Sequence, residues 1–332
     1  MSNDATHTTE LNENDVEAIG QLRDTYARLR DELGRVIVGQ YATIERLAIC
    51  MFARGHGLLM GVPGLAKTLL VRKLAETMSL KFSRIQFTPD LMPMDITGTD
   101  ILQDRAGGRR EFEFVYGPVF ANIVLADEIN RAPPKTQAAM LEAMQEQKVT
   151  VVGKSFPLAS PFMVLATQNP IEHHGTYPLP ESQLDRFLMR IELGYPAPAA
   201  EKEILKRFSN SDPQHPAGAV LTPTEVLVLQ DESRKIHIEE SIIDYMIEMV
   251  NRTRRHPDIE LGVSPRGTAA LFRAAQSLAM LEGRSFVIPD DIKKLVHPVF
   301  EHRLGMVRSG SRNHRDAGTV LQEIVDQTPV PA

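Results

Sequence analysis

The sequence predicts an α/β protein, in which a mostly parallel sheet covered by helices is followed by an all-helical region. Short apolar runs alternate with helix-length segments over the first two thirds of the chain, as in sheets that helices cover on both faces. One of these runs leads through a glycine-rich turn into a helix. After Leu221, apolar residues recur only at helical spacing.

The expected elements follow in a simple order. Residues 15–33 place apolar side chains on one face of a helix, and a second helix runs through Ile44 and Met51. Prolines bracket a connecting stretch with one short helix at 199–220, and 221–332 is expected to be helical throughout. The predicted strands are 58–60, 82–87, 123–126, 162–167 and 187–191.

Two segments between the strands are predicted to form β-hairpins. In the first, 96–101 runs to a turn at Gly107-Gly108, and 112–116 returns in strict alternation. In the second, 149–152 and 155–158 flank a two-residue turn, Gly153-Lys154, which begins with glycine. A contact with a substrate or a neighbouring subunit and simple extension of the sheet are the alternatives for both.

Length and composition indicate a globular protein of two domains. The 332 residues are 42% hydrophobic and 24% charged. The formal net charge of -6 disfavours bulk attraction to nucleic acid or to an anionic membrane. The single Cys50 excludes an internal disulfide and is expected to be buried in a helix. Because no apolar run reaches about 18 residues and the start is not signal-like, we expect a cytoplasmic protein without a transmembrane segment.

The segment 61–68, Gly-Val-Pro-Gly-Leu-Ala-Lys-Thr, has the form of a phosphate-binding loop. Gly61 and Gly64 let the backbone turn without a Cβ, so that successive N–H groups can face one concavity at a helix N-terminus. Lys67 is expected to contact the terminal phosphates, and the Thr68 hydroxyl to complete the shell of a Mg²⁺ ion. A plain turn between strand and helix is the alternative. The predicted loop set is Gly61, Val62, Pro63, Gly64, Leu65, Ala66, Lys67, Thr68 and Leu69.

Position 66 departs from the general pattern Gly-x-x-x-x-Gly-Lys-Ser/Thr, because this chain has alanine where the pattern has glycine. Alanine is tolerated there if its φ is negative. The sequence therefore predicts a negative φ at Ala66.

Two adjacent carboxylates complete the predicted site. The apolar run 123–126 ends in Asp127 and Glu128, and a buried strand has little other reason to end in two acids. Asp127 is expected to hold Mg²⁺ through its waters, and Glu128 to polarise the attacking water. A solvated strand end is the alternative. Together with the phosphate loop, the pair predicts binding and hydrolysis of ATP.

Four motifs, in this order, resemble the MoxR family of AAA+ ATPases. They are the loop 61–68, Ala-Asp-Glu-Ile-Asn-Arg-Ala at 126–132, Thr-Gln-Asn-Pro at 167–170 and Leu-Pro-Glu-Ser-Gln-Leu-Asp-Arg-Phe at 179–187. The resemblance covers about residue 35 to the C-terminus, and MoxR proteins usually carry alanine at the position of Ala66. The two hairpins match the helix-2 insert and the hairpin before sensor 1 of this clade.

The resemblance implies four parts. Residues 1–33 form an N-terminal arm with a helix, 34–198 an AAA+ nucleotide-binding core, 199–220 a linker and 221–332 a helical lid domain. ATP and Mg²⁺ are the implied cofactors.

Two further residues receive roles in hydrolysis from the resemblance. Asn169 matches sensor 1, whose amide orients the attacking water, and a plain loop amide is the alternative. Arg186 matches the arginine finger that reaches the nucleotide of the neighbouring subunit. An ion pair with Asp185 or Glu181 is the alternative for Arg186.

Arg266 matches sensor 2. It follows Ser264 and Pro265, which are predicted to be the N-cap and first residue of a lid helix, and a surface arginine is the alternative. The segment matching the adenine pocket consists of Val38, Gly39 and Gln40.

An arginine that acts on a neighbour requires a ring, so the resemblance implies a homo-oligomer, a hexamer. It also implies protein clients that contain von Willebrand factor A domains. A nucleic-acid motor or a metal-chelatase motor subunit of the same clade is the alternative, and a non-catalytic nucleotide-dependent scaffold is another. Nucleic acid is disfavoured by the acidic total and by hairpins that lack interleaved aromatic and basic residues.

Three other clusters fit function less well. The adjacent His173 and His174 lack the spacing of metal ligands. The basic residues within 252–256 are typical of a solvated helix end. Three arginines flank the first hairpin's turn, where a partner or an acidic peptide is a possible ligand: Arg105, Arg109 and Arg110.

Overall fold

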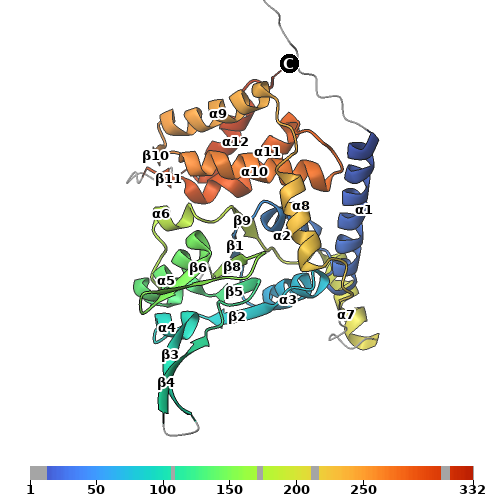
Figure 1. Ribbon diagram of the computed structural model, residues 1–332. Coiled ribbons are helices and arrows are strands. Elements are labelled where there is room, and N and C mark those ends of the chain that lie inside the picture. Colours follow the sequence, from blue (N-terminus) through green and yellow to red (C-terminus); the bar gives the residue numbers. More distant parts are fainter. Residues whose placement is uncertain (1–12, 106–108, 170–174, 211–216, 308–314, 332) are drawn as a thin grey trace, which may run out of the picture.

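A five-stranded parallel sheet lies at the centre of the molecule, with strands in the order β2-β5-β8-β1-β9 (Figure 1). The computed structural model describes residues 13–105, 109–169, 175–210, 217–307 and 315–331. The strands are β1 (Gly57–Met60), β2 (Phe82–Gln86), β5 (Ile123–Asp127), β8 (Met163–Gln168) and β9 (Met189–Glu192). All the strands expected from the apolar runs are therefore present, with ends close to those predicted.

Helices cover both faces of this sheet. On one face lie α1 (Glu13–Val36), α2 (Tyr41–Phe52) and α3 (Lys67–Thr77), and on the other lies α5 (Pro134–Glu146). Successive strand residues point to opposite faces. Leu59 and Leu125 accordingly pack into the cluster formed with α1, α2 and α3, whereas Leu58 and Val124 pack into the cluster formed with α5. This burial on both sides is why the central strands β1, β5 and β8 read as nearly continuous apolar runs.

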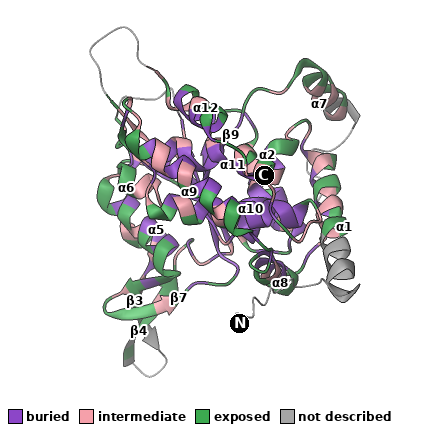
Figure 2. Ribbon diagram, turned by 90° about the horizontal axis from the view of Figure 1, so that it is seen from above, coloured by how far each residue is buried: buried purple, intermediate pink, exposed green. Residues whose placement is uncertain are grey.

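The helical lid lies over the sheet in Figure 1 and contributes to the same apolar cluster as α2. Figure 2 shows that buried residues run from the core into α10. The lid helices are α8 (Pro223–Ser233), α9 (Glu240–Arg255), α10 (Pro265–Leu281), α11 (Pro289–Phe300) and α12 (Ala317–Gln327). In the stretch that precedes the lid, α7 spans Pro198–Asn210.

The expectation that everything after Leu221 is helical is wrong at one place. Two short strands, β10 (Ile259–Leu261) and β11 (Gly305–Met306), pair antiparallel between the helices. Strands of this length are too short to produce a detectable alternation in the sequence.

The first hairpin, β3 (Gly98–Arg105) with β4 (Arg109–Tyr116), projects from the core (Figure 1). It begins later than predicted, because Ile96 and Thr97 belong to the short helix α4 (Pro93–Thr97), where Ile96 is buried. Its predicted turn at Gly107-Gly108 lies outside the described residues.

The second hairpin, β6 (Lys148–Val151) with β7 (Lys154–Pro157), has a different turn from the predicted one. Val151 pairs with Lys154, so the turn residues are Val152 and Gly153, with φ of 49° and 76°. Positive φ at both positions is the geometry that matches the twist of a hairpin. The two hairpins contact each other, because the rings of Phe114 and Phe156 stack with centroids 4.0 Å apart.

Two simpler expectations can also be compared with the structure. Cys50 lies on α2 and is fully buried, as predicted. Among the described residues, no helix combines the length and the apolar character needed to cross a bilayer.

Candidate functional site

The predicted phosphate loop and acids lie at the carboxyl edge of the sheet, where α/β proteins usually bind ligands. The loop follows β1, Asp127 ends β5, and Asn169 comes directly after β8. Because β8 lies between β1 and β5, the ends of these neighbouring strands meet at one place. The sheet order therefore brings together groups that are far apart in the sequence. We call Lys67, Asp127, Glu128 and their hydrogen-bond partners, which the sequence predicts to bind a nucleotide, the nucleotide crevice.

The backbone of the loop contradicts one prediction. Ala66 has a φ of 55° and lies in the left-handed region, as the residue that precedes α3. Gly64 also has a positive φ, 90°. A left-handed residue costs an alanine roughly 1–2 kcal/mol, so the loop holds Ala66 in a conformation that alanine does not prefer.

The loop presents backbone donors to an open side. No backbone carbonyl of the described residues accepts from the N–H groups of Gly64 or Ala66. A Cβ added at Gly64 would meet no atom within 4 Å, whereas one at Gly61 would lie 2.9 Å from the carbonyl oxygen of Leu193. Gly61 is thus needed for close packing, and Gly64 borders open space.

Lys67 lies in the same crevice as the two acids. Its Nζ donates a hydrogen bond to the carbonyl oxygen of Gly61. Burial lowers the pKa of the Lys67 ammonium, and the attraction of Asp127 and Glu128 acts in the opposite direction. The two acids therefore favour the charged form of Lys67.

The Asp127 carboxylate is held from both sides. Its Oδ2 accepts from Arg84 on β2, at 3.0 Å from Nε and 2.6 Å from Nη2. Its Oδ1 accepts from the Thr167 hydroxyl on β8, at 2.6 Å. These contacts fix the carboxylate at the end of β5 and neutralise its charge with an arginine whose side chain is 46% exposed.

Glu128 points its carboxylate in a different direction from a regular strand residue, because its φ is 56°. The hydroxyl of Thr167 accepts its backbone N–H at 2.8 Å. Its Oε2 accepts from Arg131 Nη1 at 2.9 Å and from Gln86 Nε2 at 3.2 Å. Arg131 ends the short 3₁₀ helix η1 (Ile129–Arg131), which begins directly after Glu128.

Sequence reasoning did not assign a role to the polar groups that hold the two acids: Arg84, Gln86, Arg131 and Thr167. The signal for two of them is present, because Arg84 and Gln86 alternate with the buried Ile85 along β2. Finding them also requires the sheet order, which sets Gln86 opposite Asp127.

Asn169 is nearly buried, with 9% of its surface exposed, at the carboxyl edge between the ends of β5 and β1. The adenine segment forms the turn between α1 and α2, where Gly39 has a φ of 74°. A Cβ at Gly39 would lie 2.8 Å from Cβ of Ala200. The side-chain oxygen of Gln40 is buried and has no hydrogen-bond partner among the described residues.

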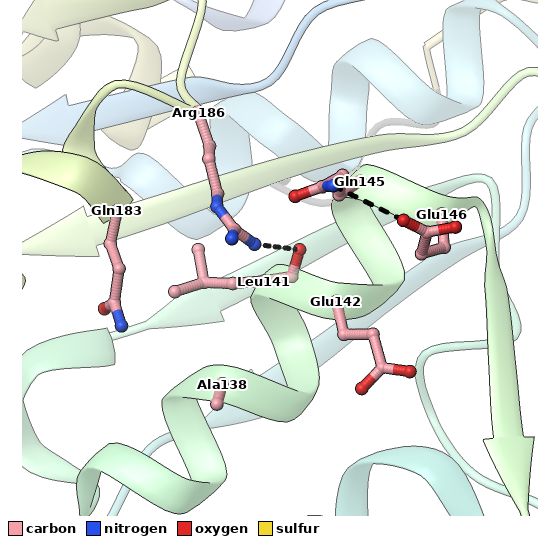
Figure 3. A pocket seen from close by; sticks show the side chains of 7 residues that line it. All are labelled: Ala138, Leu141, Glu142, Gln145, Glu146, Gln183 and Arg186. Atoms are coloured by element: carbon pink, nitrogen blue, oxygen red, sulfur yellow. Dashed lines mark hydrogen bonds between the residues drawn. The ribbon is translucent and has the colours of Figure 1, made fainter.

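Arg186 points toward α5 and lines a cavity of about 250 Å³ (Figure 3). Its Nη1 donates to the carbonyl oxygen of Leu141 at 3.1 Å, and its buried Nε has no partner among the described residues. No ion pair within the described residues joins Arg186 to Asp185 or Glu181, the predicted alternatives. The wall consists of Ala138, Leu141, Glu142, Gln145, Glu146, Gln183 and Arg186.

Arg266 is exposed in the first turn of α10. The prediction for the start of this helix is confirmed: Ser264 is the N-cap, its hydroxyl accepts from the N–H of Gly267, and Pro265 is the first helical residue. The positive charge of Arg266 is one of the causes that lower the pKa of Arg303.

Asp185 does not pair with its neighbour in sequence but with the lid. Its Oδ1 accepts from Arg303 Nε at 2.9 Å, and its Oδ2 accepts from the Ser264 hydroxyl at 2.9 Å. Burial lowers the pKa of Arg303 to about 10, although Asp185 opposes this, so the guanidinium stays charged at neutral pH. We call Asp185, Ser264, His302 and Arg303 the core–lid junction.

The remaining candidates stay without support. His173 and His174 lie outside the described residues, as do the side chains of Arg105 and Arg109. Arg110 is exposed on β4, and Arg255 is exposed at the end of α9.

A parallel sheet with a phosphate loop, an acidic strand end and a helical lid defines a nucleotide-binding protein of the AAA type. Residues 56–189 match the family described as "ATPase family associated with various cellular activities (AAA)", and 251–324 match the AAA lid domain. The crystal structure of a putative ATPase from Cytophaga hutchinsonii superposes with a TM-score of 0.88 and is 41% identical, covering 95% of this chain and 98% of that one.

Similar proteins extend the match beyond the core. Chaperone MoxR1 of Mycobacterium tuberculosis is 43% identical, over 92% of this chain and 82% of that protein. Protein MoxR of Methylorubrum extorquens is 32% identical, over 85% and 88%. An uncharacterised protein of Bacillus subtilis, YeaC, is 44% identical, over 91% and 93%. The chain belongs to the MoxR family of AAA+ ATPases.

Proposed function

We propose that this protein is a Mg²⁺-dependent MoxR-type ATPase that works as an oligomeric ring and uses ATP hydrolysis to remodel a protein client. The observation that supports this most strongly is the nucleotide crevice, where the loop that follows β1 and the acids at the end of β5 meet at the carboxyl edge of the sheet. The relative named as a chaperone in M. tuberculosis supports a protein client.

The residues of the crevice fit ATP with Mg²⁺. The described residues contain no group of three or more His, Cys, Asp or Glu side chains that could hold an ion alone. Mg²⁺ in such enzymes takes few protein ligands and completes its shell with phosphate oxygens and water. Thr68 and Asp127 would hold it here, and the ion would neutralise charge that develops on the phosphates.

Glu128 is the proposed general base. A carboxylate in this role must lie within reach of the attacking water and stay ionised. Arg131 and Gln86 hold Oε2 of Glu128 by hydrogen bonds, so both can orient the carboxylate. Asn169, at the end of the neighbouring strand, is the proposed group that positions the same water.

A substitution of Glu128 by Gln tests this proposal. The variant keeps the size of the side chain but cannot accept a proton. We expect ATP binding to remain and turnover, measured as phosphate release, to fall by about 10²–10⁴-fold. Unchanged turnover would remove Glu128 from the role of base, and lost binding would point to a damaged crevice instead.

Arg186 and Arg266 are proposed to act at two different nucleotides. Arg266 is the lid arginine for the nucleotide of its own subunit, and Arg186 is the finger for that of the neighbouring subunit in a hexameric ring. The unpartnered Nε of Arg186 and the absence of a described ion pair with Asp185 or Glu181 support a role outside its own chain.

Diluting the protein until the ring dissociates shows whether Arg186 acts on the nucleotide of a neighbouring subunit or on that of its own chain. Arg186→Ala should lower the ATPase rate of the assembled ring by about 10³–10⁵-fold. Nucleotide affinity of isolated subunits should not change. If dilute monomers of the unaltered protein hydrolyse ATP as fast as the ring does, Arg186 does not act in trans.

The client is the remaining part of the proposal. Proteins with von Willebrand factor A domains are the proposed clients. Affinity capture with Glu128→Gln loaded with ATP, followed by mass spectrometry, identifies what stays bound. Stimulation of ATPase activity by single-stranded DNA would favour a nucleic-acid motor instead, and capture of a metal-insertion complex would favour a chelatase subunit.

A further inference from the structure

Asp185 contacts the lid, and the next residue in the chain is Arg186, the proposed arginine finger. It is the C-cap of the short helix α6 (Glu181–Leu184), and its backbone N–H bonds back to the carbonyl oxygen of Glu181 at 3.0 Å. Its carboxylate turns the other way, toward Arg303 and Ser264. The two neighbours in sequence therefore have opposite surroundings.

Arg303 holds the backbone on both sides of Arg186. Its Nη2 donates to the carbonyl oxygens of Asp185, at 3.3 Å, and of Phe187, while its Nη1 donates to that of Leu188 at 3.1 Å. Only 4% of Arg303 is exposed. It ends the 3₁₀ helix η2 (Glu301–Arg303), which follows the lid helix α11. These hydrogen bonds join the backbone that carries Arg186 to this lid element.

Ser264 connects the same carboxylate to the helix that carries Arg266. Its hydroxyl donates to Asp185 and accepts from the N–H of Gly267, so one side chain joins the core to the first turn of α10. This turn also packs against Arg303, because a Cβ added at Gly267 would lie 2.9 Å from Cδ of Arg303. Arg266 lies between the two contact points, at the second residue of α10.

We propose that Asp185 is a positioning residue that couples Arg266 and Arg186 of the same subunit. Nucleotide bound at Arg266 sets the position of the lid. Through Asp185, the lid position then determines where Arg186 lies at the nucleotide of the next subunit. The coupling passes through the Asp185–Ser264 and Asp185–Arg303 hydrogen bonds. It rests on the roles proposed above for Arg186 and Arg266. Rates depend steeply on such placement, since a 1 Å error can cost about 10²-fold.

Ser264→Ala is the variant that interrupts this coupling with the least damage. Asp185→Asn would leave the buried Arg303 without its counter-charge, and such a variant risks misfolding. Ser264→Ala removes only the hydroxyl and keeps the Asp185–Arg303 pair. We expect the kcat of the assembled ring to fall by about 10-fold to 100-fold, with nucleotide affinity unchanged. Ser264→Thr, which restores a hydroxyl, should recover most of the rate.

Thr222→Ala is the matched control, because Ser264→Ala also removes a helix cap. Thr222 is likewise an N-cap followed by proline, but its hydroxyl bonds only to Glu225 in its own helix α8 among the described contacts. The two variants should lower the melting temperature by similar amounts. Only Ser264→Ala should lower kcat, and an equal loss of kcat in both would overturn the coupling.

A double-mutant cycle with Arg186→Ala separates this inference from the proposed function. If Ser264 acts through Arg186, adding Ser264→Ala to Arg186→Ala should cause no further loss, measured with enzyme in excess over ATP. If the rate losses of the two substitutions combine in full in the double variant, Ser264 does not act through Arg186 and the coupling is wrong, whereas the proposed role of Arg186 as the finger stands. If Arg186→Ala alone leaves the ring ATPase unchanged, the finger role fails and the coupling fails with it.

Discussion

The nucleotide crevice and the core–lid junction both hold carboxylates with arginines, but they do so in opposite surroundings. In the crevice, the arginine side chains are 46% exposed at Arg84 and 43% at Arg131. At the junction, the Arg303 side chain is only 2% exposed, and its donors are shared among Asp185 and several backbone carbonyls. Water or a ligand can therefore replace the arginines that contact the carboxylates of the crevice. The buried Arg303 of the junction instead keeps the core and the lid in a fixed arrangement.

This difference predicts how substitutions divide between function and stability. Exposed ion pairs contribute little to the free energy of unfolding, because water screens them. A buried charge that loses its partner costs much more. Changes in the crevice should thus alter ATP binding and turnover, and loss of the buried charge of Arg303 at the junction should alter the stability of the fold.

The largest expected effect is on ATP affinity in the crevice. Lys67→Ala removes the ammonium proposed to contact two phosphates, and charge-assisted hydrogen bonds contribute about 1.5–3 kcal/mol each. The dissociation constant for ATP should therefore rise by about 10²–10⁴-fold, measured by calorimetry or by a fluorescent analogue. Chemical denaturation should show little change in stability. A large loss of stability in this variant would break the comparison.

At the junction, Arg303→Met should destabilise the fold by about 3–5 kcal/mol, because Asp185 loses its buried partner. Urea denaturation followed by circular dichroism measures this. Lys293→Met in α11 is the control, since the Lys293–Asp290 pair is exposed and should contribute less than about 0.5 kcal/mol. A similar loss of unfolding free energy in both variants would mean that the buried Arg303 pair contributes no more to stability than an exposed ion pair.

Acid should weaken the buried part of the molecule. His56 accepts the N–H of Val164 at Nδ1, 3.0 Å away, and its Nε2 lies 3.1 Å from the carbonyl oxygen of Met144. Burial lowers the pKa of His56 from 6.5 to about 4. The unfolded chain therefore takes up the proton first, so stability is full above pH 6.5 and falls as the pH drops from 6.5 toward 4.

The size of this loss follows from about 1.4 kcal/mol per pH unit, which gives about 3 kcal/mol from His56 alone. Burial and the charge of Arg303 also lower the pKa of His302 at the junction, which adds to the loss in the same pH range. Denaturation at pH 7 and pH 4.5 measures the effect, and His56→Gln should reduce the difference. A stability independent of pH over this range would contradict the buried, neutral state of His56.

The smallest expected effect is at Ala66. Ala66→Gly relieves the cost of the left-handed conformation, about 1–2 kcal/mol, but adds backbone entropy to the unfolded chain. A net gain of about 0.5–1 kcal/mol should appear in thermal or urea unfolding. Ala75→Gly in the interior of α3 is the control and should have the opposite sign, a loss of more than about 1 kcal/mol, because Ala75 is also buried in the core.

The sequence predicted those parts of the structure that depend on neighbouring residues. The central parallel strands β1, β5 and β8 are nearly continuous apolar runs because both faces are buried, and the Ser264 cap has a local signature. Lys67, Asp127 and Glu128 belong to short motifs at strand ends. The chemistry of each motif indicates its ligand before the fold is known.

Features that depend on distant residues or on imposed backbone geometry could not be predicted in this way. Asp185 and Arg303 are 118 positions apart, and Arg84 and Asp127 are 43 apart, so only the fold brings each pair together. The φ of Ala66 is set by the path of the loop into α3, against the preference of alanine. Val152 is a similar case, because a β-branched residue rarely takes the positive φ of its turn.

The stacked rings of Phe114 and Phe156 have a mechanical consequence. The first ring lies on β4 and the second on β7, and Tyr116 and Phe120 also pack around them edge to face. The two hairpins thus pack side by side, although separate segments of the chain form them. Contact with one hairpin therefore restrains the other, and the second hairpin is joined to α5, the helix that forms the wall facing Arg186, by the short connection that precedes β6.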